Sequence, residues 1–224
     1  MEYKLVNNNK DRLIIFLTGW GCDGNQFKFM KSSEYDVLIC FNYTNLDLDF
    51  DFSKYKEYYL IAFSAGVCVS SLIQDKLPPL KKKIAINGNP LAYNEHYGLR
   101  KEILEVFAGV RKETALEFRR DFLVYDDKEF KMFNSTQPLR TFESCKEELA
   151  SLQSYDNENI SLMDFDIAVL SMDDKIFYFD RQKEYWSEKS QCVILDDSAH
   201  FPFFRLNSFD KILECDNNLL EAVI

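Results

Sequence analysis

Tyr59-Leu60-Ile61-Ala62-Phe63-Ser64-Ala65-Gly66 is the stretch that decides the fold, because an apolar run ends there at a serine set between small residues. The residues two before and two after the serine, Ala62 and Gly66, are both small. A nucleophilic serine on a tight strand-to-helix turn needs such neighbours, since bulky side chains would collide there. The pattern favours Ser64 as a nucleophile at the end of a buried strand. The competing interpretation is an ordinary strand end followed by a buried helix of small residues.

Other short apolar runs are bounded by turn residues, as is typical of strands buried on both faces of a parallel sheet. These runs cover residues 13–17, 37–41, 59–63, 84–86, 167–170 and 192–195. Residues 1–6 are expected to pair antiparallel with run 13–17, and helical patterns cover 26–32, 65–75 and 208–222. This alternation predicts an α/β fold, a mostly parallel doubly wound sheet with helices on both faces.

The size and composition of the chain limit the classes of protein it can belong to. With 224 residues, 46% of them hydrophobic, it can bury one good-sized core, so we expect a single domain over 1–224. A net charge of −10 argues against a general nucleic-acid binder. The sequence has neither a run of membrane-spanning length nor a secretory leader at its start, which makes the cytoplasm the default location. Scattered cysteines without a CxxC pair, and only two histidines, predict reduced thiols and no metal site.

A serine nucleophile needs an imidazole to take its proton and a carboxylate to orient that imidazole. Of the two histidines, His200 follows the last predicted strand, at the carboxyl end of the sheet where catalytic groups gather. His96 lies in a polar segment and is expected to have a surface or hinge role. The acid should follow the preceding strand, where Asp173 and Asp174 are adjacent.

Asp174 is the better candidate for the acid, with Asp173 as the alternative. Many hydrolases show a small residue, two variable residues, the acid and then an apolar pair, which aligns with Ser171 and with Ile176-Phe177. The resulting chain order of serine, acid and histidine is the order used by α/β-hydrolases. The sequence therefore predicts that fold.

The loop Thr18-Gly19-Trp20-Gly21, directly after the first buried strand, is expected to help stabilise an oxyanion. The backbone amide of Trp20 would point into the same space as the amide of Ala65, and two such donors are what acyl transfer needs. Residues 19–24 also match the G-x-G-x-x-G dinucleotide pattern. We set that interpretation aside because the second strand ends Cys40-Phe41-Asn42, without the acidic residue that would bind a ribose.

Residues 91–159 interrupt the alternation with a long, charged, helical stretch that is rich in phenylalanine. Such an excursion is too long for a connecting loop. We expect a small helical cap over the serine, and the alternative is a helical layer packed on the sheet edge. Three of its arginines, Arg111, Arg119 and Arg120, could form a positive patch through which an acidic enzyme meets an acidic partner. Intrahelical ion pairing on a solvated surface is the competing interpretation.

Four segments together resemble the BioG-type pimeloyl-acyl-carrier-protein methyl ester esterases of bacterial biotin synthesis. They are Gly19-Trp20-Gly21, Ala62-Phe63-Ser64-Ala65-Gly66, residues 85–90 leading to Tyr97-Gly98-Leu99, and His200-Phe201-Pro202-Phe203. The similarity runs over nearly the whole chain. Two positions depart from the usual hydrolase pattern, since Thr18 stands where many relatives have histidine and Ala62 replaces a glycine.

The resemblance implies an α/β-hydrolase with a small helical cap that cleaves the methyl ester of a pimeloyl chain carried on acyl carrier protein. It implies Ser64 as nucleophile, His200 as general base and acid, Asp174 as orienting carboxylate, and the amides of Trp20 and Ala65 as oxyanion donors. No cofactor and no membrane are implied, and a monomer is favoured. The alternatives are a general short-chain carboxylesterase or thioesterase, and a hydrolase-fold binding protein without turnover.

Overall fold

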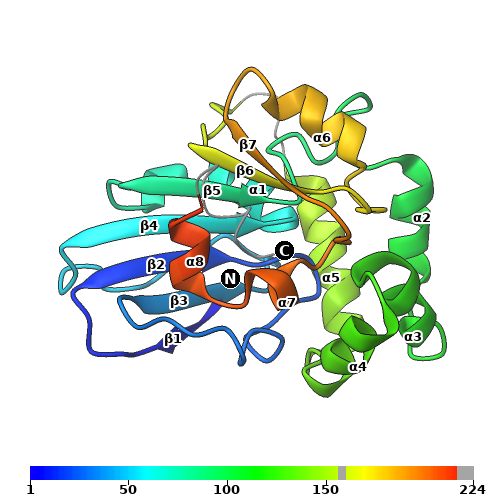
Figure 1. Cartoon of the computed structure of the whole chain (residues 1–224), viewed down its shortest axis with the longest axis horizontal. Helices are drawn as coiled ribbons and strands as arrows, with labels where there is room; N and C mark the ends of the chain where they lie inside the picture. The colour runs from blue at the N-terminus through cyan, green and yellow to red at the C-terminus, as the bar shows by residue number, and fades with distance from the viewer. Residues whose placement is uncertain (156–159, 216–224) are drawn as a thin grey trace.

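Seven strands form one sheet in the computed structural model, which describes residues 1–155 and 160–215 (Figure 1). The order across the sheet is β1-β3-β2-β4-β5-β6-β7. The strands are β1 (Glu2–Val6), β2 (Arg12–Leu17), β3 (Asp36–Phe41), β4 (Glu57–Phe63), β5 (Lys82–Ile86), β6 (Ile167–Ser171) and β7 (Gln191–Leu195). All neighbours pair parallel except β1, which is antiparallel. The mostly parallel sheet expected from the sequence is therefore present.

The pairing of β1 differs from the expectation. It pairs with β3, with Glu2 opposite Phe41, and not with the strand that follows it in the chain. Both edges of β2 are already occupied, by β3 and β4, so the first strand adds to the free edge of β3. The buried carboxylate of Asp36 at the start of β3 supports this course, because it accepts hydrogen bonds from the amides of Asn8 (2.7 Å) and Lys10 (3.1 Å).

Helices cover both faces of the sheet. Outside the segment between β5 and β6, they are α1 (Ala65–Leu72), the short 3-10 helix η1 (Gln74–Lys76), α6 (Phe179–Trp186), α7 (Phe203–Leu206) and α8 (Phe209–Leu213). Of the helix expected over 208–222, the structure shows Phe209–Leu213 as α8, and residues 216–222 lie outside the described residues.

The helix expected over 26–32 is wrong: that segment forms turns. Side chains there bond the local backbone, since the Asp23 amide donates to Gln26 Oε1 (2.9 Å) and the Asn25 amide to Asp23 Oδ1 (2.7 Å). Such bonds offer the backbone an alternative to the helical ladder.

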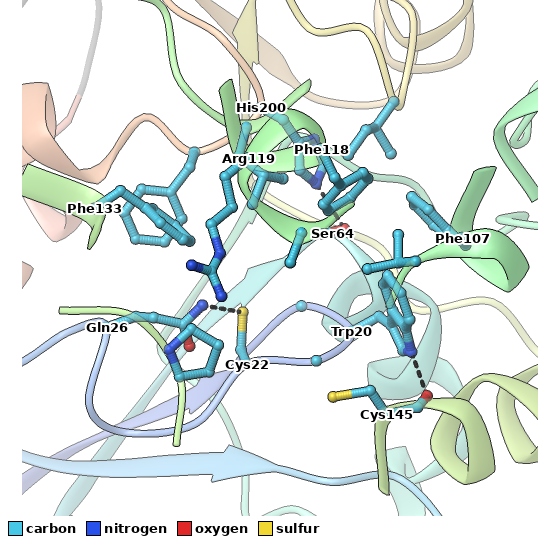
Figure 2. Close-up of a pocket in the computed structure, with 18 of the residues that line it drawn as sticks. Trp20, Cys22, Gln26, Ser64, Phe107, Phe118, Arg119, Phe133, Cys145 and His200 are labelled. Carbon is cyan, nitrogen blue, oxygen red and sulfur yellow. Dashed lines mark hydrogen bonds between the residues drawn. The ribbon is translucent and has the colours of Figure 1, made fainter. Parts of the chain in front are cut away.

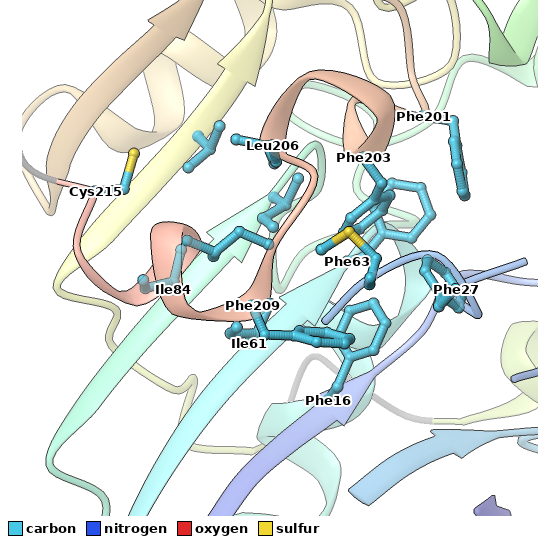
Figure 3. Close-up of a cluster of buried hydrophobic side chains, with 14 of the residues drawn as sticks. Phe16, Phe27, Ile61, Phe63, Ile84, Phe201, Phe203, Leu206, Phe209 and Cys215 are labelled. Carbon is cyan, nitrogen blue, oxygen red and sulfur yellow. The ribbon is translucent and has the colours of Figure 1, made fainter. Parts of the chain in front are cut away.

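Alternate residues of the strands enter two separate cores, as the period of two in a strand requires. From β2, Ile14 and Phe16 face a core closed by α7 and α8. Leu13, Ile15 and Leu17 face a core closed by α1 and α6. Figure 3 shows the first core as a cluster of rings, in which Phe16 meets Phe209 edge-on with ring centroids 5.3 Å apart. The two cores hold β4 rigidly at the centre of the sheet, and Ser64 follows β4.

The chain between β5 and β6 forms α2 (Lys101–Gly109), α3 (Ala115–Phe118), a π-helical turn η2 (Arg119–Leu123), α4 (Asp127–Ser135) and α5 (Phe142–Ser154). These helices lie together beside the sheet (Figure 1). The end of the expected segment, residues 156–159, lies outside the described residues. In the part of the chain that is described, no helix is long and apolar enough to cross a membrane.

Candidate active site

Ser64 occupies the sharp turn between β4 and α1. Its φ of 54° is unusual for a residue with a side chain, and such strained backbone persists only where the surroundings fix it. A Cβ on Gly66 would lie 2.3 Å from the carbonyl oxygen of Leu17, and a Cβ on Gly88 would lie 2.6 Å from that of Ser64. The Ser64 amide donates to the Ile86 carbonyl oxygen (2.9 Å). The crowding explains why the sequence has small residues around the serine.

His200 lies in the loop after β7, and its Nε2 is 2.9 Å from Ser64 Oγ. The imidazole is buried beside the ring of Phe63, with ring centroids 5.1 Å apart. The side-chain amide of Asn87 donates to the His200 carbonyl oxygen (2.9 Å), which fixes the backbone that carries the imidazole. Sequence reasoning did not identify this contribution of Asn87.

Asp174 is the carboxylate that meets His200. Its Oδ2 lies 2.9 Å from His200 Nδ1, while its Oδ1 accepts hydrogen bonds from the amides of Ile176 (2.8 Å) and Phe177 (3.0 Å). A carboxylate on Nδ1 keeps the proton there, so Nε2 is free to accept the serine proton. Asp173 is exposed instead, with its amide bonded to the Ser198 carbonyl oxygen.

The loop with Trp20 passes directly over the serine. A Cβ on Gly19 would lie 3.1 Å from the Cβ of Ser64. The Trp20 indole N–H donates to the Cys145 carbonyl oxygen (2.7 Å), and the indole stacks on Phe107 at 4.7 Å. Ala65 is the first residue of α1, a position where the backbone N–H has no partner within the helix. Both expected oxyanion donors therefore belong to segments that adjoin Ser64.

A pocket of about 820 Å³, including its open mouth, lies between the sheet and the helices of the β5–β6 segment. In Figure 2, Trp20 and Phe107 lie on one side of Ser64 and Phe133 on the other. The aromatic side chains lining it are Trp20, Phe63, Phe107, Phe118, Phe133, Phe142 and Phe201. An apolar pocket with a few polar groups at the serine suits an aliphatic acyl chain.

The three arginines expected to dock a partner have different surroundings. Arg119 is partly buried and lines the pocket, where it donates to Gln137 Oε1 (2.7 Å), and burial lowers the pKa of its guanidinium. Arg111 is exposed beside Glu113 (3.7 Å). Arg120 is exposed and lies over the ring of Phe130, 4.6 Å from its centroid.

The remaining histidine lies away from these groups. The exposed His96 bonds Glu184 Oε1 (2.8 Å). Among residues 1–155 and 160–215, there is no group of three or more histidine, cysteine or acidic side chains that could hold a metal ion.

A buried ion pair next to the Trp20 loop was not anticipated from the sequence. Glu148 is 0% exposed and pairs with Arg140 at 2.5 Å. Burial raises the pKa of Glu148, an effect that Arg140 and the backbone amides of Gly21 and Tyr43 oppose. The signal was present in α5: Glu148 falls on the stripe formed by Cys145, Leu149 and Leu152, which predicts burial.

The sequence profile of the family described as pimeloyl-ACP methyl esterase BioG matches residues 1–212. The chain belongs to this family. The solved structure of BioG from Haemophilus influenzae superposes with a TM-score of 0.85 at 27% identity, covering 95% of this chain and 99% of that one. Membership of the BioG family supports a role as an esterase in biotin synthesis, in agreement with the resemblance found in the sequence.

Two further similarities have a narrower meaning. A malonyl-[acyl-carrier protein] O-methyltransferase of Bacteroides fragilis is 30% identical over 191 residues, which cover 84% of this chain but only 39% of that protein. An esterase from Exiguobacterium antarcticum superposes with a TM-score of 0.67 at 12% identity, covering 99% of this chain and 94% of that one, and shows the fold alone. With the BioG structure, it establishes the α/β-hydrolase fold.

Proposed function

We propose that the protein is a serine carboxylesterase that hydrolyses the methyl ester of pimeloyl-acyl carrier protein through an acyl-enzyme. The observation that carries the proposal is the continuous contact from Ser64 Oγ to His200 Nε2 and from His200 Nδ1 to Asp174 Oδ2, each 2.9 Å. Family membership supports the choice of substrate.

In the proposed reaction, His200 Nε2 takes the proton of Ser64 while Oγ attacks the ester carbonyl carbon. The amides of Trp20 and Ala65 stabilise the oxyanion of the tetrahedral intermediate. His200 then returns the proton to the methoxy oxygen, methanol leaves, and the pimeloyl group stays on Ser64. Water, deprotonated by His200, attacks the acyl-enzyme and releases the free pimeloyl carboxylate with Ser64 restored.

The segment 91–159 acts in this proposal as a cap that shapes the acyl site. Phe107, Phe118, Phe133 and Phe142 of this segment line the pocket, so the methylenes of the pimeloyl chain would replace water against apolar walls. The carrier protein would dock outside, with the exposed Arg111 and Arg120 as the cationic side chains of the docking surface, whereas Arg119 lines the pocket. This role of the arginines stays a prediction.

Methanol release from carrier-bound pimeloyl methyl ester tests the proposal. We expect turnover by the unmodified protein and none by Ser64→Ala. Circular dichroism should show that both proteins are folded. Hydrolysis of p-nitrophenyl butyrate at a higher kcat/KM than the carrier-bound ester would favour a general carboxylesterase. Folded protein with no Ser64-dependent turnover of either ester would favour a binding protein.

Charge reversal separates carrier docking from chemistry. Arg120→Glu should lower kcat/KM for the carrier-bound ester and leave kcat/KM for p-nitrophenyl butyrate unchanged. Lys10→Glu is the matched control, because Lys10 lies in the turn before β2, at the opposite end of that strand from the loop over Ser64. Equal effects of Arg120→Glu on both esters would remove the docking role.

A further inference from the structure

The buried pair of Arg140 and Glu148 connects α5 to the loop over the serine. Neither residue contacts Ser64, His200 or Asp174 through a hydrogen bond, yet the Arg140 and Glu148 side chains are only 8% and 0% exposed. Removing two charges from water is costly unless further hydrogen bonds satisfy both groups. The hydrogen-bond partners of Arg140 and Glu148 therefore indicate which segments the ion pair holds in place.

Glu148 divides its two oxygens between two loops. Oε2 accepts a hydrogen bond from the amide of Gly21 (2.9 Å), and Oε1 accepts one from the amide of Tyr43 (2.9 Å). The Tyr43 hydroxyl in turn donates to the carbonyl oxygen of Thr18 (2.9 Å). One carboxylate thus fixes the backbone on both sides of Trp20, directly at Gly21 and through Tyr43 at Thr18.

Arg140 orients this carboxylate and adds to the same attachment. Its Nη1 donates to Glu148 Oε2 and, at 3.4 Å, to the Cys22 carbonyl oxygen, while its Nη2 donates to Asn42 Oδ1 (3.0 Å) and Ser144 Oγ (2.9 Å). A second link from α5 reaches the Trp20 side chain, whose indole N–H donates to the Cys145 carbonyl oxygen (Figure 2). Backbone and side chain of the loop are therefore both attached to α5.

We propose that Glu148 is a positioning residue that aims the Trp20 amide at the oxyanion, so that α5 is a working part of the catalytic site. This inference rests on the proposed roles of Ser64 and Trp20. Catalytic donors have to be held to within about half an ångström. Loss of one oxyanion donor lowers kcat by about 10²–10³-fold. Misaiming it should cost less, about 10–100-fold, and should appear in kcat because the contact forms in the transition state.

Glu148→Gln tests the inference with almost no change in shape. The Gly21 and Tyr43 amides bond different oxygens of Glu148, and in the carboxamide one of these positions becomes an NH2 group that cannot accept. The matched control is Glu147→Gln, which makes the same change at the exposed neighbouring position of α5. The assay is p-nitrophenyl butyrate hydrolysis with kcat and KM measured separately, alongside the thermal unfolding midpoint.

We expect kcat to fall about 10–100-fold in Glu148→Gln at an unchanged KM, and to stay at the unmodified value in Glu147→Gln. A trifluoromethyl ketone, to which Ser64 Oγ adds to give a tetrahedral oxyanion, should bind more weakly by a similar factor, an effect that mere loss of stability would not produce. Unchanged kcat and ketone affinity in folded Glu148→Gln would overturn the inference.

A second variant covers the case in which Glu148→Gln does not fold. Arg140→Lys keeps the positive charge and the carboxylate but loses the forked contacts, and the same fall in kcat is expected, with unchanged kcat counting against the inference. Failure of the proposed function is distinguishable, because the unmodified protein would then show no Ser64-dependent hydrolysis.

Discussion

Asp174→Asn should nearly abolish turnover while leaving the fold intact. Two backbone amides, those of Ile176 and Phe177, donate to Oδ1, so the carboxamide has to keep its oxygen there. Its NH2 group then occupies the position of Oδ2, 2.9 Å from His200 Nδ1. A donor facing Nδ1 selects the tautomer protonated on Nε2, which cannot accept the proton of Ser64.

The magnitude follows from the role of the tautomer. The corresponding substitution in a serine protease triad lowers kcat by about 10⁴-fold, and at 1.36 kcal/mol per factor of ten this is about 5.4 kcal/mol of barrier. We expect a similar fall in kcat for p-nitrophenyl butyrate, with KM unchanged. The matched control is Asp173→Asn, which changes the adjacent exposed carboxylate and should remain active. Asp174→Asn within tenfold of the unmodified protein, or an equal loss in Asp173→Asn, would refute the reasoning.

Three further outcomes are expected. Arg140→Met should lower the free energy of unfolding in urea by about 3–5 kcal/mol, because it leaves Glu148 buried without its partner; a change under 1 kcal/mol would contradict this. Gly66→Ala should unfold the protein or sharply lower its melting temperature, since the added Cβ would lie 2.3 Å from a carbonyl oxygen of β2, whereas Gly109→Ala meets no atom within 4 Å and should not. Burial raises the pKa of Cys145 to about 11, which disfavours the thiolate. The rate of its alkylation by iodoacetamide, followed by mass spectrometry, should therefore rise about tenfold per pH unit between pH 8 and 10. An alkylation rate that does not change with pH would contradict this.

Local sequence patterns predicted the sheet because each central strand carries its own signal. The apolar runs became strands, and the crowded turn at Ser64 was visible as small residues around a serine. The partner of β1 was not predictable in this way. The strand edge that is free to accept β1 depends on where β3 and β4 pair with β2. The sequence of residues 1–6 contains no information about that pairing.

Some side chains of the candidate site could likewise be predicted from the sequence, and others could not. Ser64, Asp174 and His200 could be selected because each follows a strand and its residue type suits a known chemistry. The sequence places Arg119 in one positive patch with Arg111 and Arg120, but its contacts with Gln137 turn it into the pocket. Those contacts depend on how η2 packs against the segment after α4, which charge patterning does not describe.

The carboxylate of Glu148 is needed for its hydrogen bonds to the backbone as well as for its ion pair with Arg140. Buried ion pairs can often be replaced by apolar side chains of similar volume at no loss of stability. Here an apolar replacement would leave the amides of Gly21 and Tyr43 without acceptors, at about 1–3 kcal/mol for each unsatisfied donor. The group required at this position is therefore one that accepts from two loops at once. Because Trp20 lies between the points that it fixes, the same requirement that stabilises the loops also sets the direction of the amide proposed to meet the oxyanion.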